Sequence, residues 1–98
     1  MITSKQRSYL KRLAHELDPI VHIGKNDVTD NVINEIDTLL ELRELVKVKI
    51  QDGSQAEPKE TANELAKKLN AEFVQAIGKK FVLYRQSKEN KQIELPKK

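Results

Sequence analysis

The sequence predicts a single α/β domain in which helices pack on a four-stranded mixed sheet, in the order α-β-α-β-α-β-β. Three segments carry apolar residues at helical spacing, and four shorter segments have strand character. The chain has 98 residues, which suits one hydrophobic core and not two. Strands that are separated by helices favour parallel pairing, whereas the last two strands should form an antiparallel hairpin.

Each predicted helix has a start signal. Residues 3–17 read as the first helix, because Thr3 and Gln6 have the spacing of a capping box and the residue before Pro19 avoids helical geometry. Thr29 is the expected N-cap of the second helix. Pro58 suits the first turn of the third. We therefore expect helices to follow residues 3, 29 and 57.

The strands are expected at residues 20–23, 45–50, 72–77 and 81–85, the last two joined by a tight turn at residues 78–80. The segment 45–50 alternates apolar residues with Lys47 and Lys49. We divide the chain into a domain at 1–86 and a basic, polar C-terminal tail at 87–98. We expect this tail to be loosely held, although Ile93 and Leu95 alternate as docking residues would.

The composition narrows the classes of function. Cysteine is absent, so the chain has no disulfide, thiol nucleophile or thiolate metal site. The polar N-terminal residues and the lack of a long apolar run lead us to expect no signal peptide, no membrane partner and a cytoplasmic location. No nucleotide-binding fingerprint and no recognisable catalytic or metal-ligand spacing is present, so we expect no enzyme activity, cofactor, metal or small-molecule substrate.

Charge is unevenly distributed along the chain, whose formal net charge is +3. The first fourteen residues contain bases and no acid, residues 67–98 are mostly basic, and residues 27–44 are mostly acidic. A fold that joins the two ends would have one basic face and one acidic helix. Such polarity suits a polyanionic partner. The alternative is a protein-interaction module that uses the acidic second helix.

The turn between the first strand and the second helix is the most informative segment. It contains Gly24, Lys25, Asn26 and Asp27, and its backbone amides and the helix dipole would favour an anion. Two interpretations stay open, a clamp for an RNA phosphate and an ordinary strand-to-helix turn. Asp27 and Asp30 weaken the clamp, since carboxylates compete for the same amides.

Other side chains could extend an RNA-binding surface. These candidates are Lys5, Lys11 and Arg12 on the first helix and Lys79, Lys80 and Arg85 around the hairpin. Tyr84 is a candidate for stacking on a base, and with so few aromatic residues we expect recognition of RNA backbone or shape. We interpret His15 and His22 as structural.

The chain also resembles a known family almost from end to end. The residues that carry the resemblance are Thr3-Ser4-Lys5-Gln6 with Leu10, Leu13-Ala14-His15, Pro19-Ile20-Val21, Ile23-Gly24-Lys25-Asn26 with Val28-Thr29, Glu44-Leu45-Val46-Lys47-Val48-Lys49, Val74-Gln75-Ala76-Ile77-Gly78-Lys79, Val82-Leu83-Tyr84-Arg85 and Ile93-Glu94-Leu95-Pro96. In this order they resemble the bacterial YhbY-type RNA-binding proteins, which are stand-alone CRM (chloroplast RNA splicing and ribosome maturation) domains.

The resemblance implies a fold similar to the C-terminal domain of translation initiation factor three. It also implies RNA binding, with precursors of the large ribosomal subunit and their ribosomal RNA as partners. The family's Gly-x-x-Gly loop maps onto Gly24, Lys25, Asn26 and Asp27, so Asp27 replaces the second glycine. Aspartate tolerates the left-handed conformation better than most residues, so we expect the turn to survive.

Overall fold

The order of elements agrees with the sequence prediction. The structure, a computed structural model, describes residues 2–97. Its elements are α1 (Ser4–His15), β1 (Val21–Ile23), α2 (Asp30–Arg43), β2 (Leu45–Ile50), α3 (Pro58–Lys68), β3 (Glu72–Ile77) and β4 (Lys80–Tyr84). Residues 1 and 98, the ends of the predicted domain and tail, lie outside the described residues.

The helices begin where their caps predict. The Thr3 hydroxyl accepts the Gln6 amide at 3.1 Å, and the Gln6 side chain accepts the Thr3 amide at 3.0 Å, which completes the capping box. Thr29 caps α2 through the Val32 amide at 3.2 Å. The first helix ends at His15 and not at Leu17, because the Leu17 amide bonds to Ala14 in a tighter final turn.

The sheet has the strand order β1-β2-β4-β3. Parallel pairing occurs between β1 and β2, while β4 is antiparallel to both β2 and β3. The predicted hairpin is therefore confirmed, with β4 inserted between β2 and β3. Strand β4 begins and ends one residue before the prediction, because Lys80 already pairs with Lys49 and Ile77.

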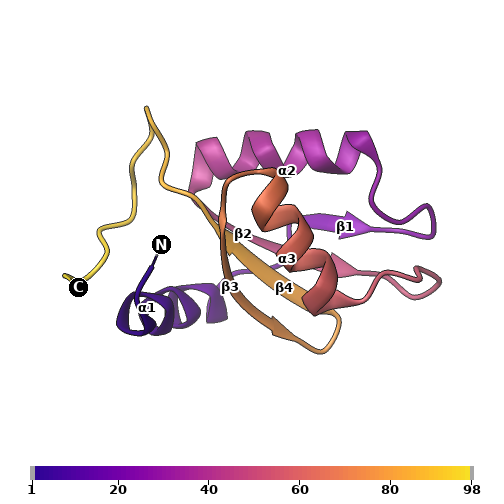
Figure 1. Cartoon of the computed structure of the whole chain (residues 1–98), viewed down its shortest axis with the longest axis horizontal. Coiled ribbons are helices and arrows are strands. Elements are labelled where there is room, and N and C mark those ends of the chain that lie inside the picture. The colour runs from indigo at the N-terminus through magenta and orange to yellow at the C-terminus, as the bar shows by residue number, and fades with distance from the viewer. Residues whose placement is uncertain (1, 98) are drawn as a thin grey trace.

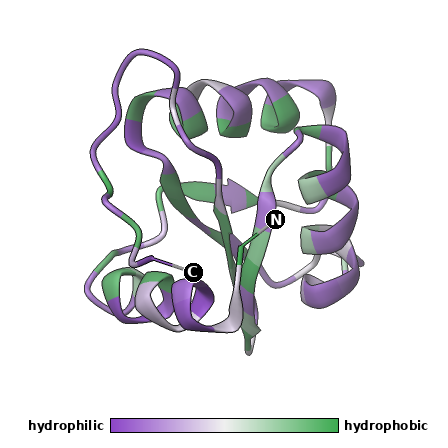
Figure 2. Cartoon of the chain, turned by 60° about the vertical axis from the view of Figure 1, so that its left-hand side comes forward, coloured by the Kyte–Doolittle hydropathy of each residue, from purple (hydrophilic) through white to green (hydrophobic). Residues whose placement is uncertain are grey.

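The two faces of the sheet are covered differently (Figure 1). Helices α2 and α3 pack on one face over a core that includes Ile36, Leu40, Leu65, Val48 and Phe81. Helix α1 packs on the other face through Leu10 and Ala14, which form a second cluster with Leu45, Val74, Val82 and Tyr84. Figure 2 shows the corresponding hydrophobic colour along the strands and on the inward sides of the helices.

Helix α1 covers only one end of its face of the sheet. At the other end, a row of in-register residues crosses all four strands, and its members His22, Lys49, Lys80 and Ile77 are all exposed. Side chains at paired positions of neighbouring strands point to the same face. The fold thus leaves half of one sheet face open and lines it with cationic side chains.

The segment after β4 is fastened to the domain, which corrects the expectation of a loosely held tail. The buried Glu44 carboxylate accepts the backbone amides of Ser87 at 2.7 Å, Gln92 at 2.6 Å and Ile93 at 2.7 Å. Ile93 and Leu95 pack against the α1 cluster. In Figure 1 this segment runs from the end of α2 towards α1.

Candidate nucleic-acid interface

The predicted phosphate loop is a turn between β1 and α2. The Asp27 amide donates to the Gly24 carbonyl at 2.9 Å, and Asp27 has φ of 57°. The expectation that aspartate adopts the left-handed conformation here is confirmed. Lys25 and Asn26 are exposed at the tip of the turn. Asp27, at the position of the family's second glycine, therefore has the left-handed backbone conformation that glycine usually adopts.

The carboxylate of Asp27 is occupied by the loop between β2 and α3. It accepts hydrogen bonds from the Ser54 hydroxyl and from the Gln55 amide at 2.9 Å. These two bonds, the Ser54 bond foremost, lower the pKa of Asp27. The negative charge of Asp27, which would repel an RNA phosphate, is thus bound by two hydrogen-bond donors of the protein.

The N-terminus of α2 contributes less than the sequence suggested. Thr29 already satisfies the Val32 amide, and Asp30 is an acid in the first turn of the helix. An acidic side chain there competes with any bound anion for the positive end of the dipole. The attraction to phosphate at this loop therefore depends mainly on Lys25.

Two further loops lie beside the Lys25 turn. The Gln51 amide donates to the Ile23 carbonyl at 2.9 Å, and the Ile50 amide donates to the Lys79 carbonyl at 2.7 Å. A Cβ placed on Gly53 would be 3.9 Å from the Cβ of Lys25. The three loops therefore meet at one end of the sheet, on the right in Figure 1.

Lys79 in this group has an acidic partner. Its ammonium group lies 3.0 Å from the Asp52 carboxylate, and this contact lowers the pKa of Asp52. The Lys79 side chain is 58% exposed, so the pair lies in water and constrains the lysine weakly. Lys80 is exposed on the adjoining sheet face, opposite Lys49. Both hairpin lysines can therefore reach a polyanion.

The basic residues of α1 approach the same sheet face. Lys5, Lys11 and Arg12 are exposed, and the Arg12 guanidinium lies 5.8 Å from the centre of the Tyr9 ring. Lys11 lines a hollow along the edge strand β3 together with Gln75 and Ile77. The same two residues line a second hollow with Lys79 and Lys80. A continuous surface thus joins α1 to the hairpin.

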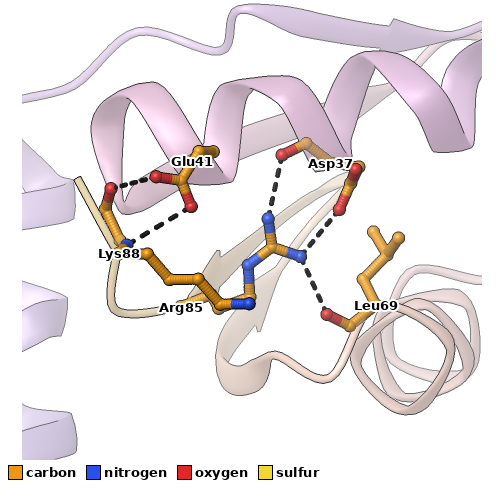
Figure 3. Close-up of polar contacts among 6 residues, drawn as sticks. Asp37, Glu41, Leu69, Arg85 and Lys88 are labelled. Carbon is orange, nitrogen blue, oxygen red and sulfur yellow. Dashed lines mark hydrogen bonds and ion pairs between the residues drawn. The ribbon is translucent and has the colours of Figure 1, made fainter. Parts of the chain in front are cut away.

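Arg85 lies apart from the hairpin turn, at the opposite end of β4. Five strand residues separate it from Lys79, a span of about 20 Å. Its guanidinium bonds to the Asp37 carboxylate at 2.7 Å, to the Asp37 carbonyl at 3.0 Å and to the Leu69 carbonyl at 2.9 Å (Figure 3). Arg85 therefore ties α2 to the end of α3, and we do not include it in the interface proposed below.

One interpretation from the sequence, the stacking role of Tyr84, needs correction, and the structure adds the positions of the two histidines. Tyr84 is buried in the α1 cluster, so it cannot stack on a base. His15 and His22 are both exposed and not part of a core. His22 pairs with Lys49 across the sheet, and His15 lines the hollow beside Lys80. The strand register determines that His22 is exposed beside Lys49. In the sequence, only the alternation of apolar and polar residues around His22 indicated this exposure.

The acidic helix α2 and its C-cap residue Glu44 are partly engaged within the molecule. Asp37 binds Arg85, while Glu41 and Glu44 accept hydrogen bonds from residues 87–93. The Ser87 hydroxyl bond is the main reason that the pKa of Glu41 is lowered. The face that the protein-interaction alternative requires is thus partly used by the chain itself.

The described part of the chain has neither a metal-binding cluster nor a membrane-spanning helix. Residues 2–97 contain no group of three or more histidine, cysteine, aspartate or glutamate side chains placed to hold a metal ion. Within the same residues, no helix is long and apolar enough to cross a membrane. The notable chemical feature is therefore a cationic surface on an α/β domain.

This combination defines a class, a small α/β domain with a half-open, cationic sheet face. Residues 2–85 match the CRS1 / YhbY (CRM) domain family, and the chain belongs to that family. The resemblance inferred from the sequence is thereby confirmed.

Relatives of similar length support this assignment. The chain is 46% identical over 96 residues to the Bacillus subtilis protein named "Probable RNA-binding protein YqeI", covering 98% of this chain and 100% of the relative. It is 40% identical over 97 residues to a Haemophilus influenzae protein named "RNA-binding protein", covering 99% and 97% of the two chains.

A solved structure is also similar. The solution structure of the Staphylococcus aureus protein SAV1595 has a TM-score of 0.82 to this chain at 49% identity, covering 98% of this chain and 100% of the other. The α/β architecture is therefore shared with an experimentally determined relative.

Proposed function

We propose that this protein binds RNA through one cationic face and associates in the cytoplasm with precursors of the large ribosomal subunit. The observation that supports the RNA interface most directly is the gathering of lysines from separate segments. Lys25 and Lys79 come from two loops that meet at one sheet end, Lys80 begins β4 beside them, and Lys11 joins them across the open sheet face. The names of the relatives point the same way.

The proposed interface contacts the RNA backbone. Lys25 binds a phosphate at the Gly24–Asp27 turn, with Asn26 and the loop amides beside it. Lys79 and Lys80 bind phosphates farther along the same surface, and Lys5, Lys11 and Arg12 extend the contact over α1. Each neutralised phosphate releases counterions, so affinity falls as salt rises. The protein acts by binding, without a catalytic step or a cofactor.

The large ribosomal subunit is the partner implied by the family resemblance. A precursor particle exposes folded ribosomal RNA with irregular, partly unpaired segments, which present phosphates in varied geometries. A small rigid face with several lysines can bind such RNA by shape and charge. The protein-interaction alternative receives less support, because two acids of α2, Asp37 and Glu41, already bind Arg85 and the C-terminal segment.

Gradient sedimentation of the tagged protein with cell lysate tests the ribosomal assignment. We expect co-migration with large-subunit precursors at low salt and its loss at moderate salt. The triple variant Lys25→Ala/Lys79→Ala/Lys80→Ala should migrate as free protein at both salts. A matched triple variant on other surfaces, Lys67→Ala/Lys68→Ala/Lys88→Ala, should co-migrate as the wild type does. Free migration of the wild type at both salts would contradict the proposal.

A further inference from the structure

An apolar side chain stands among the cations of the open sheet face. Ile77 is 68% exposed at the end of the edge strand β3. It pairs with Lys80, which pairs in turn with Lys49. Exposing an isoleucine in this position gives up the free energy of its burial. If the surface bound phosphates only through its lysines, the exposed Ile77 side chain would have no role in binding.

Ile77 borders a hollow of about 470 Å³ on the same face. The hollow has apolar lining from Ile77 and Val82, an amide from Gln75, and cations from Lys79 and Lys80. His15 at the end of α1 and Lys47 also line it. The Lys47 ammonium is held by the carbonyls of Ala14 at 3.3 Å and Leu17 at 3.1 Å. Lys80 is exposed, and Lys79 has only its solvent-exposed pair with Asp52 to exchange, so these two lysines are the ones that can bind an anion.

This lining matches a ligand with a flat, partly apolar body and a negative charge beside it. A nucleotide has this chemistry, since its base can lie against an aliphatic surface while its phosphates meet lysines. The Gln75 amide and the His15 imidazole offer donors and acceptors for a base edge. An apolar peptide segment would bring no negative charge to the two lysines that line the hollow.

We propose that the hollow binds one unpaired nucleotide of the RNA, with its base on Ile77 and Gln75 and its neighbouring phosphates on Lys79 and Lys80. The inference rests on the proposed RNA-binding function. It adds to the attraction between lysines and phosphates a preference for single-stranded over double-stranded RNA. A base in a duplex has both faces stacked and cannot place one on Ile77, whereas an unpaired base can. The protein then prefers RNA with an unpaired segment to a continuous duplex.

The test compares two RNA probes, an unstructured single-stranded oligonucleotide and a duplex of equal length, at the same salt. Ile77→Ala should weaken binding of the single strand about fivefold, the size expected for an aliphatic side chain that loses part of its buried surface. The same change should alter duplex binding by less than about twofold. Leu42→Ala is the matched control, because Leu42 is 50% exposed on α2, outside the surface that lines the hollow.

NMR shifts of the wild type give a second measurement that does not depend on the variant. The single strand should shift the amide signals of Gln75 and Val82 and the side-chain methyl signals of Ile77, and the duplex should shift only the amide signals near Lys25 and the hairpin lysines. Equal effects of Ile77→Ala on both probes would overturn the inference and leave the proposed function intact. Unmoved Ile77 signals with both RNAs would assign the hollow to another occupant, such as a protein segment, and would also overturn it. Failure of the wild type to bind either RNA would overturn both proposals.

Discussion

Asp27 illustrates how one residue can replace a glycine and keep the backbone of a turn. Its φ of 57° is the conformation for which glycine is usually needed. The carboxylate is stabilised by Ser54 and Gln55 on the neighbouring loop, so the side chain has a structural use that glycine lacks. Lys25, two residues earlier, is left exposed at the tip of the turn.

The role of Lys25 can be tested with the substitution Lys25→Ala. The variant should bind RNA about tenfold more weakly, the effect of losing roughly 1.4 kcal/mol from a charge-assisted contact. Because the contact is to phosphate, the loss should be the same for RNAs of different sequence, and the salt slope should fall by about one. Binding assays on several unrelated RNAs measure this. A loss confined to one sequence would mean that Lys25 reads a base.

The exposure of side chains on the strands could not be predicted from residue type, because it depends on the strand register. The sequence does not reveal that His22, Lys49, Lys80 and Ile77 share a row, since three of the four come from strands far apart in the chain. Tyr84 ends the second strand of the hairpin and Arg85 follows it, yet Tyr84 is buried and Arg85 binds Asp37. The sequence pattern identifies residues of a suitable type for RNA binding, and tertiary packing determines which of them remain exposed.

At the scale of elements, helix starts could be predicted and strand order could not. The caps at Thr3 and Thr29 and the proline at the start of α3 act within one turn of chain, so the sequence contains the whole signal. The insertion of β4 between β2 and β3 depends on contacts between segments that are distant in sequence. The position of α1 over only half of a sheet face has the same origin.

The C-terminal segment depends on one buried carboxylate. Glu44 is 0% exposed, has φ of 67° and accepts three backbone amides from residues 87–93. Hydrogen bonds to a charged group contribute about 1.5–3 kcal/mol each, and removing the charge weakens all of them. The segment is therefore expected to detach before the sheet unfolds.

The corresponding prediction concerns Glu44→Gln. The amide is nearly isosteric but uncharged, so it should weaken the three bonds and speed hydrogen exchange at residues 87–96. Exchange in β2 and β4 should change much less. Hydrogen-exchange mass spectrometry resolves these regions. Equal acceleration throughout the domain would show that Glu44 supports the whole fold rather than the segment.

At the scale of the whole molecule, three carboxylates link stability to pH. The pKa values of Asp27, Glu41 and Asp52 are all lowered by hydrogen bonds or by a lysine. The folded state therefore binds protons less readily than the unfolded state. Their contribution to stability is present above the unfolded pKa, about 4, and is lost as pH falls through the lower folded values.

We expect the urea midpoint to decrease as pH falls below about 5. In Asp27→Asn the decrease should be shallower, because one of the three linked groups no longer titrates. Urea denaturation of both proteins across this pH range measures the difference. Parallel profiles would mean that the Asp27 contacts with Ser54 and Gln55 contribute nothing to the pH dependence.

The cationic face is also a property of the whole molecule. Sequence analysis predicted a basic surface from the charge at the two ends of the chain, and the fold brings Lys11 and the hairpin lysines to adjoining hollows. It could not predict the exposed isoleucine between them. Ile77 lies on the outer face only because of the strand register and the short reach of α1.

The proposed RNA interface can be tested by the salt dependence of RNA affinity. Affinity for one structured RNA should be measured over a salt series for the wild type, for Lys25→Ala/Lys79→Ala/Lys80→Ala and for Lys67→Ala/Lys68→Ala/Lys88→Ala. The slope of log affinity against log salt should be lower by about two to three in the first variant and unchanged in the second. Equal slopes in all three proteins would contradict the interface proposed for the Lys25 loop and the hairpin.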